Sequence, residues 1–290
     1  MSTSPDHPSP SIPPFMDPAE ITGLGEVIWC DVRWYITGRD GHRAYVEGHV
    51  PGAVHVDLDR LAGAPDEGRG RHPLPTPEDL ADYLSSLGIS GRVPVVAYDD
   101  MGGLVAARLV WMLRTLGVDA TLLNGGLGAW EGPVETGEVE IEPARFEVRA
   151  WPTDRLADVL EVEELSRMIS DGTDTEVTIV DVRAPARYRG EEEMIDPRAG
   201  HIPGAVNIPV ASKLDGDRRV PDPAALAAHY REHGVDRADG VIVSCGSGVT
   251  ACHDLLAMEH AGLGLGRLYP GSWSEWCSDP SRPVAGGAAT

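Results

Sequence analysis

The chain has 290 residues, a length that allows two domains of ordinary size, each with a core of its own. Its 24 lysines and arginines stand against 46 aspartates and glutamates, and the formal net charge of −22 repels nucleic-acid phosphates and anionic membrane surfaces. We therefore expect neither nucleic acid nor a membrane as a partner.

The amino-terminal segment 1–19 is polar and proline-rich, with neither a basic region nor an apolar core, and predicts a disordered leader rather than a secretory signal. Arg108 and Arg114 interrupt the most apolar stretch, 101–118, so no membrane-spanning helix is expected. The four cysteines contain no C-x-x-C pair, which argues against a zinc site and a disulfide framework. We expect no metal and a location in the reducing cytoplasm.

The same series of sequence blocks occurs twice along the chain. In the first copy the blocks are "WCDVRW" (29–34), "EGHVPGAVHV" (47–56), "VVAYDDMGGLVAARL" (95–109) and "LLNGGLGAW" (122–130). In the second copy they are "IVDVRA" (179–184), "AGHIPGAVNI" (199–208), "VIVSCGSGVTACHDL" (241–255) and "LYPGSWSEW" (268–276). A repeat of this length and order indicates a duplicated domain.

Each copy alternates short β-branched runs with helical segments, and we expect one helix near 77–87 and its counterpart near 223–233. This alternation is typical of a parallel sheet covered by helices. We therefore predict an α/β protein of two tandem domains, each a parallel sheet flanked by helices.

The predicted domains span 20–130 and 158–280. The acidic stretch between them, 131–157, lies outside the repeat and is punctuated by prolines, which predicts an inter-domain linker. The last ten residues, 281–290, are predicted to form a flexible tail.

Residues that match between the copies are better explained by architecture than by chemistry, because only the second copy has the candidate nucleophilic cysteine, which lies within its third block. The pair Asp31 and Arg33 matches Asp181 and Arg183, and predicts a charge-paired turn at a strand end in each copy. His49 and His201 also match, within G-H-x-P-G turns, and we expect both to scaffold those turns.

Residues that differ between the copies are candidates for the active site. Cys245 aligns with Asp99, Ser247 aligns with Met101, and Arg187 aligns with Thr37.

The run 241–244 predicts a strand that delivers Cys245 to the carboxyl end of a parallel sheet, where ligands bind in open α/β folds. Gly246 and Gly248 allow a sharp turn before a helix that is expected to start near Thr250. We expect the loop amides to converge on the sulfur and, with the positive helix end, to stabilise a nucleophilic thiolate. The other cysteines, at 30, 252 and 277, are expected to be buried and inert.

The D-V-R, G-H-[VI]-P-G-A-V and C-G-S-G-V-T-A blocks resemble those of the two-domain sulfurtransferases, which include rhodanese and 3-mercaptopyruvate sulfurtransferase. The resemblance covers roughly residues 20 to 280, and in that family the first copy has lost its cysteine, as Asp99 indicates here. It implies that Cys245 carries sulfur as a persulfide, with no other cofactor. The implied donors are 3-mercaptopyruvate and thiosulfate, and the implied acceptors are cyanide or a small or protein thiol such as thioredoxin.

The loop sequence points to one donor. Thiosulfate-preferring members resemble C-R-K-G-V-T, whereas Cys245 is followed by the neutral residues Gly246 and Ser247, as in the mercaptopyruvate type. We therefore predict 3-mercaptopyruvate as the donor, with a thiosulfate-preferring enzyme as the alternative. The resemblance also assigns substrate binding to the loop residues Gly246, Gly248, Val249 and Thr250.

Arginines are expected to anchor the donor carboxylate, since a guanidinium binds a carboxylate in bidentate fashion. Arg187 matches the family's substrate arginine, Arg183 is a second candidate, and Arg71 could add a contact. The mercaptopyruvate enzymes also use a serine, histidine and aspartate set. By motif these fall on Ser247, on His72 in "GRGRHPLP" and on Asp59 in "HVDLDR", the last two from the first domain.

Two other classes compete with this interpretation. Cysteine phosphatases need C-x5-R so that an arginine clamps the phosphate, but the residue six positions after Cys245 is Ala251. A non-catalytic sulfur-carrier or interaction module is the second alternative, and it suits the first domain best because that domain carries Asp99.

Overall fold

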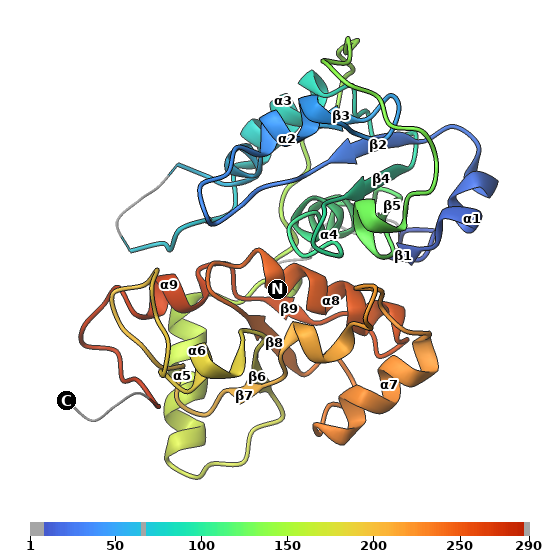
Figure 1. The fold of residues 1–290 in the computed structure, drawn as a ribbon. Coiled ribbons are helices and arrows are strands. Elements are labelled where there is room, and N and C mark those ends of the chain that lie inside the picture. Colours follow the sequence, from blue (N-terminus) through green and yellow to red (C-terminus); the bar gives the residue numbers. More distant parts are fainter. Residues whose placement is uncertain (1–8, 65–67, 287–290) are drawn as a thin grey trace. The chain divides into compact units, whose positions relative to one another are not determined.

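The computed structural model describes residues 9–64 and 68–286. The described chain divides into two compact units, each built on one parallel sheet (Figure 1). The first unit contains residues 9–63, 74–152 and 214–221, and the second contains 64, 68–73, 153–213 and 222–286. Each unit thus follows one copy of the repeat but includes a short segment from the other half of the chain. This exchange assigns Arg71 and His72 to the second unit.

The sheet of the first unit has the strand order β1-β5-β4-β2-β3, and all its paired strands are parallel. Its strands are β1 (Phe15–Met16), β2 (Ile28–Asp31), β3 (Val54–His55), β4 (Val95–Tyr98) and β5 (Ala120–Leu123). Its α-helices are α1 (Pro18–Ile21), α2 (Gly41–Glu47), α3 (Pro77–Ser86) and α4 (Ala107–Thr115). Its 3-10 helices are η1 (Thr22–Leu24), η2 (Leu58–Leu61) and η3 (Gly126–Ala129).

The sheet of the second unit has the order β7-β6-β8-β9, again with parallel pairs. Its strands are β6 (Thr178–Asp181), β7 (Val206–Asn207), β8 (Val241–Ser244) and β9 (Arg267–Leu268). Its α-helices are α5 (Val159–Ser170), α6 (Pro185–Tyr188), α7 (Pro223–Glu232), α8 (Thr250–His260) and α9 (Ser272–Trp276). Its 3-10 helices are η4 (Thr153–Arg155) and η5 (Val210–Lys213).

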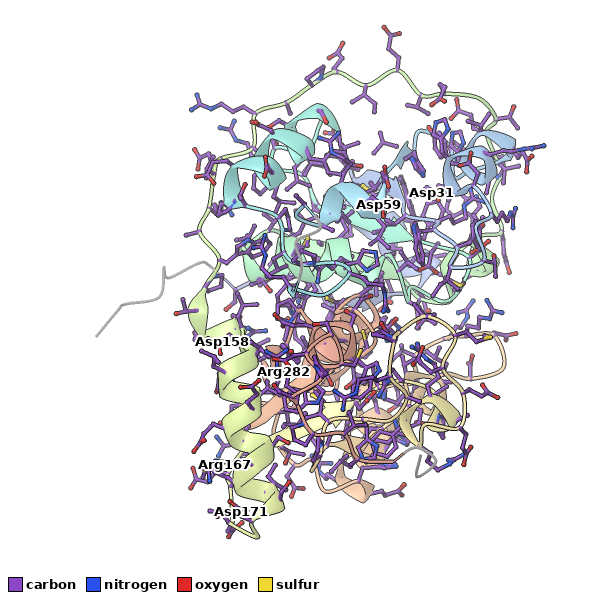
Figure 2. All side chains as sticks on the ribbon, turned by 90° about the vertical axis from the view of Figure 1, so that its left-hand side faces the viewer. Asp31, Asp59, Asp158, Arg167, Asp171 and Arg282 are labelled. Carbon is purple, nitrogen blue, oxygen red and sulfur yellow. The ribbon has the colours of Figure 1, made fainter. Side chains whose placement is uncertain are left out.

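Local sequence explains where these elements lie. The central strands β4 and β8 are buried along their whole length, as expected for uninterrupted apolar runs in a parallel sheet. Thr76 caps α3 and Asp222 caps α7, each just before a proline at the first helical position. Asp158 caps α5, and Figure 2 shows it at one end of that helix, with Arg167 and Asp171 near the other. The predicted fold class and the two predicted helices, now α3 and α7, are confirmed.

The matched residues form the same turn in both units. The Nη2 atom of Arg33 lies 2.6 Å from a carboxylate oxygen of Asp31 and donates to the carbonyl of Gly48. The Nη2 atom of Arg183 lies 2.6 Å from Asp181 and donates to the carbonyl of Gly200. The Nδ1 atoms of both turn histidines, 49 and 201, contact backbone carbonyls of their own unit at 2.9 and 2.7 Å. The expectation that these residues are architectural is confirmed.

The structure corrects three expectations about segments outside the repeat. The predicted leader is ordered at β1, which is buried and pairs with β5, because Phe15 and Met16 complete the sheet edge; residues 1–8 lie outside the described residues. The predicted linker is part of the first unit as far as residue 152, with Phe146 buried. The predicted tail is held to the second unit at Ala285, which forms an antiparallel β-bridge with His201. Residues 287–290 lie outside the described residues.

Candidate active site

Cys245 directly follows β8 at the carboxyl end of the sheet and is 4 % exposed. Its backbone is held from both sides, because its N–H donates to the Ser272 hydroxyl at 3.1 Å and its carbonyl accepts from the Trp273 N–H at 3.0 Å. The next carbonyl, of Gly246, accepts from the N–H of Ser274 at 2.9 Å. The helix α8 begins at Thr250, as predicted. The segment that includes α9 thus holds the cysteine loop at the N-terminus of α8.

Ser272 was not predicted to belong to the site. It has a left-handed backbone with φ of 50°, an unusual conformation for a residue with a side chain, and its buried hydroxyl also donates to the carbonyl of Tyr269. The equivalent residue of the first unit is Gly126, with φ of 62°. The repeat blocks 122–130 and 268–276 already align these two residues, so the comparison of copies that identified Cys245 could also have identified Ser272.

Two guanidinium groups lie against the cysteine loop. A Cβ atom placed on Gly246 would be 3.1 Å from Nη2 of Arg71 and 3.5 Å from Nη1 of Arg187. The two arginine side chains are 31 % and 22 % exposed, so both remain accessible to a small anion. Burial lowers the pKa of the Arg71 guanidinium, and negative charge on Cys245 counteracts this shift. The geometry therefore brings the predicted Arg71 and Arg187 to the residue next to the predicted nucleophile.

The arginines belong to an alternating series of charges that starts at the end of β6. The series comprises, in order of contact, Asp181, Arg183, Glu193, Arg187, Asp196 and Arg71. Glu193 binds Arg187 with both carboxylate oxygens at 2.8 Å, and Asp196 contacts Arg187 at 3.2 Å and also pairs with Arg71. Both acidic side chains are almost fully buried, at 4 % and 3 % exposure.

Glu193 and Asp196 were also missed by the sequence analysis. Neither has an acidic counterpart in the first copy, so the rule that singled out Arg187 applies to them as well. Arg183, by contrast, was a predicted substrate contact, but its side chain is 2 % exposed and repeats the contacts of Arg33. Arg183 thus pairs with Asp181 in the turn and lies 3.8 Å from Glu193, and its role in donor binding stays a prediction.

The predicted histidine and serine meet within the second unit. Nδ1 of His72 lies 2.8 Å from Oγ of Ser247, a hydrogen-bond distance at which either group can carry the shared proton, depending on the histidine tautomer. His72 precedes α3 of the first copy in sequence, yet its segment packs with the second unit, which is a difference from the expected assignment to the first domain.

Asp59, the third member of the predicted set, lies in η2 of the first unit, where Figure 2 labels it. Its N–H donates to the side chain of Asp57 at 3.0 Å, and burial together with the negative charge of Asp57 raises the pKa of the Asp59 carboxyl. Its role stays a prediction.

The loop of the first copy shows what this backbone arrangement binds. The carboxylate of Asp99, at the end of β4, accepts four backbone N–H groups, two on each oxygen, at 2.7 to 3.0 Å. The donors are Met101, Gly103, Val105 and Ala106. Burial raises the pKa of Asp99, and these four hydrogen bonds counteract that shift. A loop at this position of the fold is thus able to surround an anion with amides.

The remaining cysteines at 30, 252 and 277 are buried, as expected, and all four cysteines are free. Burial raises the pKa of the Cys30 thiol and of the Cys277 thiol, which keeps both in the unreactive protonated form. No helix within 9–64 and 68–286 is long and apolar enough to cross a membrane.

Comparison with known proteins agrees with this geometry. The family model described as "Rhodanese-like domain" matches twice, at residues 20–133 and 161–279. A Mycobacterium tuberculosis protein named "Putative thiosulfate sulfurtransferase SseB" is 42 % identical over 280 residues, covering 93 % of this chain and 96 % of the relative. A Pseudomonas aeruginosa protein named "Probable 3-mercaptopyruvate sulfurtransferase" is 42 % identical over 257 residues, covering 85 % of this chain and 87 % of the relative.

Among solved structures, the Escherichia coli 3-mercaptopyruvate sulfurtransferase SseA matches with a TM-score of 0.76 at 32 % identity, covering 91 % of this chain and all of that one. The two matched domains and these relatives define a class, the enzymes with two rhodanese domains. The chain belongs to the rhodanese family and is a sulfurtransferase, which confirms the resemblance seen in the sequence.

Proposed function

We propose that the protein moves the sulfur atom of 3-mercaptopyruvate through a persulfide on Cys245 to cyanide or to a thiol. The observation that carries this donor assignment is the contact of 2.8 Å between His72 and Ser247, two residues after the nucleophile. A proton relay is needed when the leaving group departs as a carbanion, which must be protonated at carbon. Of the two donors, 3-mercaptopyruvate has such a leaving group, the enolate of pyruvate, whereas thiosulfate releases sulfite.

In the first half-reaction, the Cys245 thiolate attacks the thiol sulfur of the donor. The carbon–sulfur bond breaks and its electron pair goes to the methylene carbon, which leaves as the enolate of pyruvate. The proton from the donor thiol reaches that carbon through the Ser247 hydroxyl and the His72 imidazole. Pyruvate departs, and Cys245 remains as a persulfide anion.

In the second half-reaction, cyanide or a thiolate attacks the outer sulfur of the persulfide. The sulfur–sulfur bond breaks, its electrons return to Cys245 as a thiolate, and the acceptor leaves as thiocyanate or as a new persulfide. The cycle needs no oxidant and no further cofactor. A protein thiol such as that of thioredoxin is a suitable acceptor, and the four free cysteines favour the reducing cytoplasm as the location.

The donor carboxylate binds between Arg71 and Arg187, the two partly exposed guanidinium groups beside Gly246. This placement brings the donor sulfur toward Cys245, the residue before that glycine. By analogy with the amides around Asp99, the negative sulfur is stabilised by the backbone N–H groups of Ser247, Val249 and Ala251, which are the equivalents of Met101, Gly103 and Val105 in the first copy. The expected contacts of Gly248 and Thr250 stay predictions.

Thiosulfate is the second candidate donor, and the 42 % identity to the mycobacterial relative favours it. Attack on its outer sulfur releases sulfite, which takes the electron pair of the sulfur–sulfur bond and needs no proton. The two donors therefore share the persulfide but differ in their need for Ser247 and His72.

Mass spectrometry of the intact protein after incubation with each donor tests the proposal. We expect a gain of one sulfur atom that is located on Cys245 and is lost on addition of cyanide or a thiol. A protein that gains no sulfur from either donor would be a binding module and not the proposed enzyme. Steady-state kinetics with both donors then decide between them, and a higher kcat/KM for thiosulfate would reject the donor assignment.

A further inference from the structure

One carboxylate joins the two guanidinium groups beside the nucleophile. Asp196 pairs with Nη1 of Arg71 through one oxygen, and its other oxygen accepts from Nη2 of Arg187 at 3.2 Å. The side chain of Asp196 is 3 % exposed, whereas the two arginines are 31 % and 22 % exposed. Solvent and small anions thus reach the arginines, while their shared counterion lies behind them.

The position of Asp196 is set by its own turn. Its backbone N–H donates to a carboxylate oxygen of Glu193 at 3.0 Å, and the N–H of Ile195 donates to the same oxygen at 3.0 Å. The turn 193–196 therefore has backbone support that does not depend on the Asp196 side chain. A substitution that removes only the negative charge of Asp196 should leave the turn in place.

The charges next to the donor site balance. The series that ends at Arg71 holds three arginines and the three carboxylates of Asp181, Glu193 and Asp196, so its formal charges cancel and the two partly exposed arginines add no net positive charge. The loop residues after Cys245 are neutral as well. Such a site provides directed N–H donors for one carboxylate but little net attraction for a second negative charge.

We propose that Asp196 is a specificity-determining residue, which neutralises the paired guanidinium groups of Arg71 and Arg187 so that the site accepts a monocarboxylate donor and disfavours a dianion. This inference rests on the proposed function, since it assigns the donor class of that same site. Asp196 acts through the arginines and does not itself contact the donor.

The physical basis is that Coulomb energy is proportional to the charge of the ligand. Removing the negative charge of Asp196 leaves one uncompensated positive charge near the donor, and a dianion gains about twice as much from it as a monoanion. The partly buried setting limits screening by water, so the change affects the ratio of the two donors and not only their common affinity.

The test is the Asp196→Asn variant, which keeps the size of the side chain and one acceptor oxygen. We expect the ratio of kcat/KM for thiosulfate to kcat/KM for 3-mercaptopyruvate to rise about tenfold, mainly through a lower KM for thiosulfate, and the rise to shrink with added salt. Asp196→Glu restores the charge and should return the ratio toward that of the wild type.

Glu191→Gln is the matched control, because Glu191 is an exposed carboxylate in the same segment and pairs with Arg189. It should leave the ratio unchanged. If Asp196→Asn does not fold, Glu193→Gln removes the other carboxylate that binds Arg187 and should shift the ratio in the same direction.

An unchanged ratio in the folded variant, equal losses on both donors, or the same shift in Glu191→Gln would overturn the inference. Intact mass measured on the same samples separates this failure from a failure of the proposed function. If the wild type forms the persulfide but Asp196→Asn has the same ratio of kcat/KM values as the wild type, the inference alone is rejected. If the wild type forms no persulfide, both the inference and the proposed function are rejected.

Discussion

The two cysteine-loop positions, Asp99 in the first unit and Cys245 in the second, follow equivalent buried strands and are held by equivalent backbone contacts. The carbonyl of Asp99 accepts from the N–H of Leu127 at 2.7 Å, as the carbonyl of Cys245 accepts from Trp273 at 3.0 Å. The difference lies in the side chain that the loop surrounds. The carboxyl group of Asp99 itself accepts hydrogen bonds from the amides of its loop. In the second unit the equivalent position holds the thiol of Cys245, on which the proposed function places the transferred sulfur.

A second difference concerns the groups around the loop. The first unit has Met101 where the second has Ser247. Arg187 directly precedes Tyr188, whose contacts match those of Tyr45, so its structural counterpart is Ala44 and not Thr37 as the sequence alignment suggested. The first loop therefore lacks both the hydroxyl next to a histidine and the matching arginine. Duplication thus left an equivalent loop in both units. The second unit combines it with Cys245, with the contact of His72 and Ser247 and with two guanidinium groups, to which the proposed function assigns the roles of nucleophile, proton relay and anchors.

The largest loss of activity is expected when the proposed nucleophile of the second loop is replaced. The Cys245→Ser variant should lose sulfur transfer from every donor, because a serine hydroxyl cannot hold a sulfane sulfur, and it should keep its fold. Turnover assays with both donors and intact mass after donor treatment measure this. Appreciable turnover in the variant would show that another residue carries the sulfur.

The anchors come next in expected effect. Arg187→Ala should raise the apparent KM for 3-mercaptopyruvate by roughly one to two orders of magnitude, the equivalent of losing a charge-assisted contact of about 1.5–3 kcal/mol. Steady-state kinetics on this variant check the value. Arg189→Ala is a suitable control, since Arg189 is exposed and pairs with Glu191. Kinetics of Arg187→Ala that match those of the control would remove Arg187 from the site.

Much of this arrangement could be predicted because it is local in sequence or doubled in the chain. The strand β8, the glycines after Cys245 and the start of α8 follow from residues within ten positions of each other, and the repeat separated the turn pairs from the candidates. The repeat also contained a signal for Ser272, whose left-handed backbone matches that of Gly126.

The parts that could not be predicted depend on contacts between distant segments. The pairing of Asp196 with Arg71 joins residues 125 positions apart, and no periodicity or spacing indicates it. The exchange that places His72 in the second unit likewise depends on tertiary packing, as does the pairing of β1 with β5 within the predicted leader. Arg183 had two interpretations from the sequence, a charge-paired turn and a second donor contact, and the structure shows the turn pairing with Asp181.

The proton relay should have a smaller effect that depends on the donor. His72→Ala and Ser247→Ala should each lower kcat for 3-mercaptopyruvate by a factor of about 100, within the range typical of general acid–base catalysis, and lower kcat for thiosulfate much less. The reason is that the pyruvate enolate must be protonated, whereas sulfite leaves without a proton. Equal losses on both donors would mean that the contact of 2.8 Å between these residues is structural.

The smallest effect on catalysis is expected for the anion of the first unit. Asp99→Ala removes a fully buried acceptor of four backbone N–H groups, and leaving these groups unpaired should lower the free energy of unfolding by about 3 kcal/mol. Chemical denaturation measures this loss. Activity per folded molecule should stay unchanged with both donors, because the proposed function places the donor, the persulfide and the proton relay at the second loop. A variant that kept its stability and lost its activity would show instead that Asp99 takes part in sulfur transfer, and that the two loops share one chemical task.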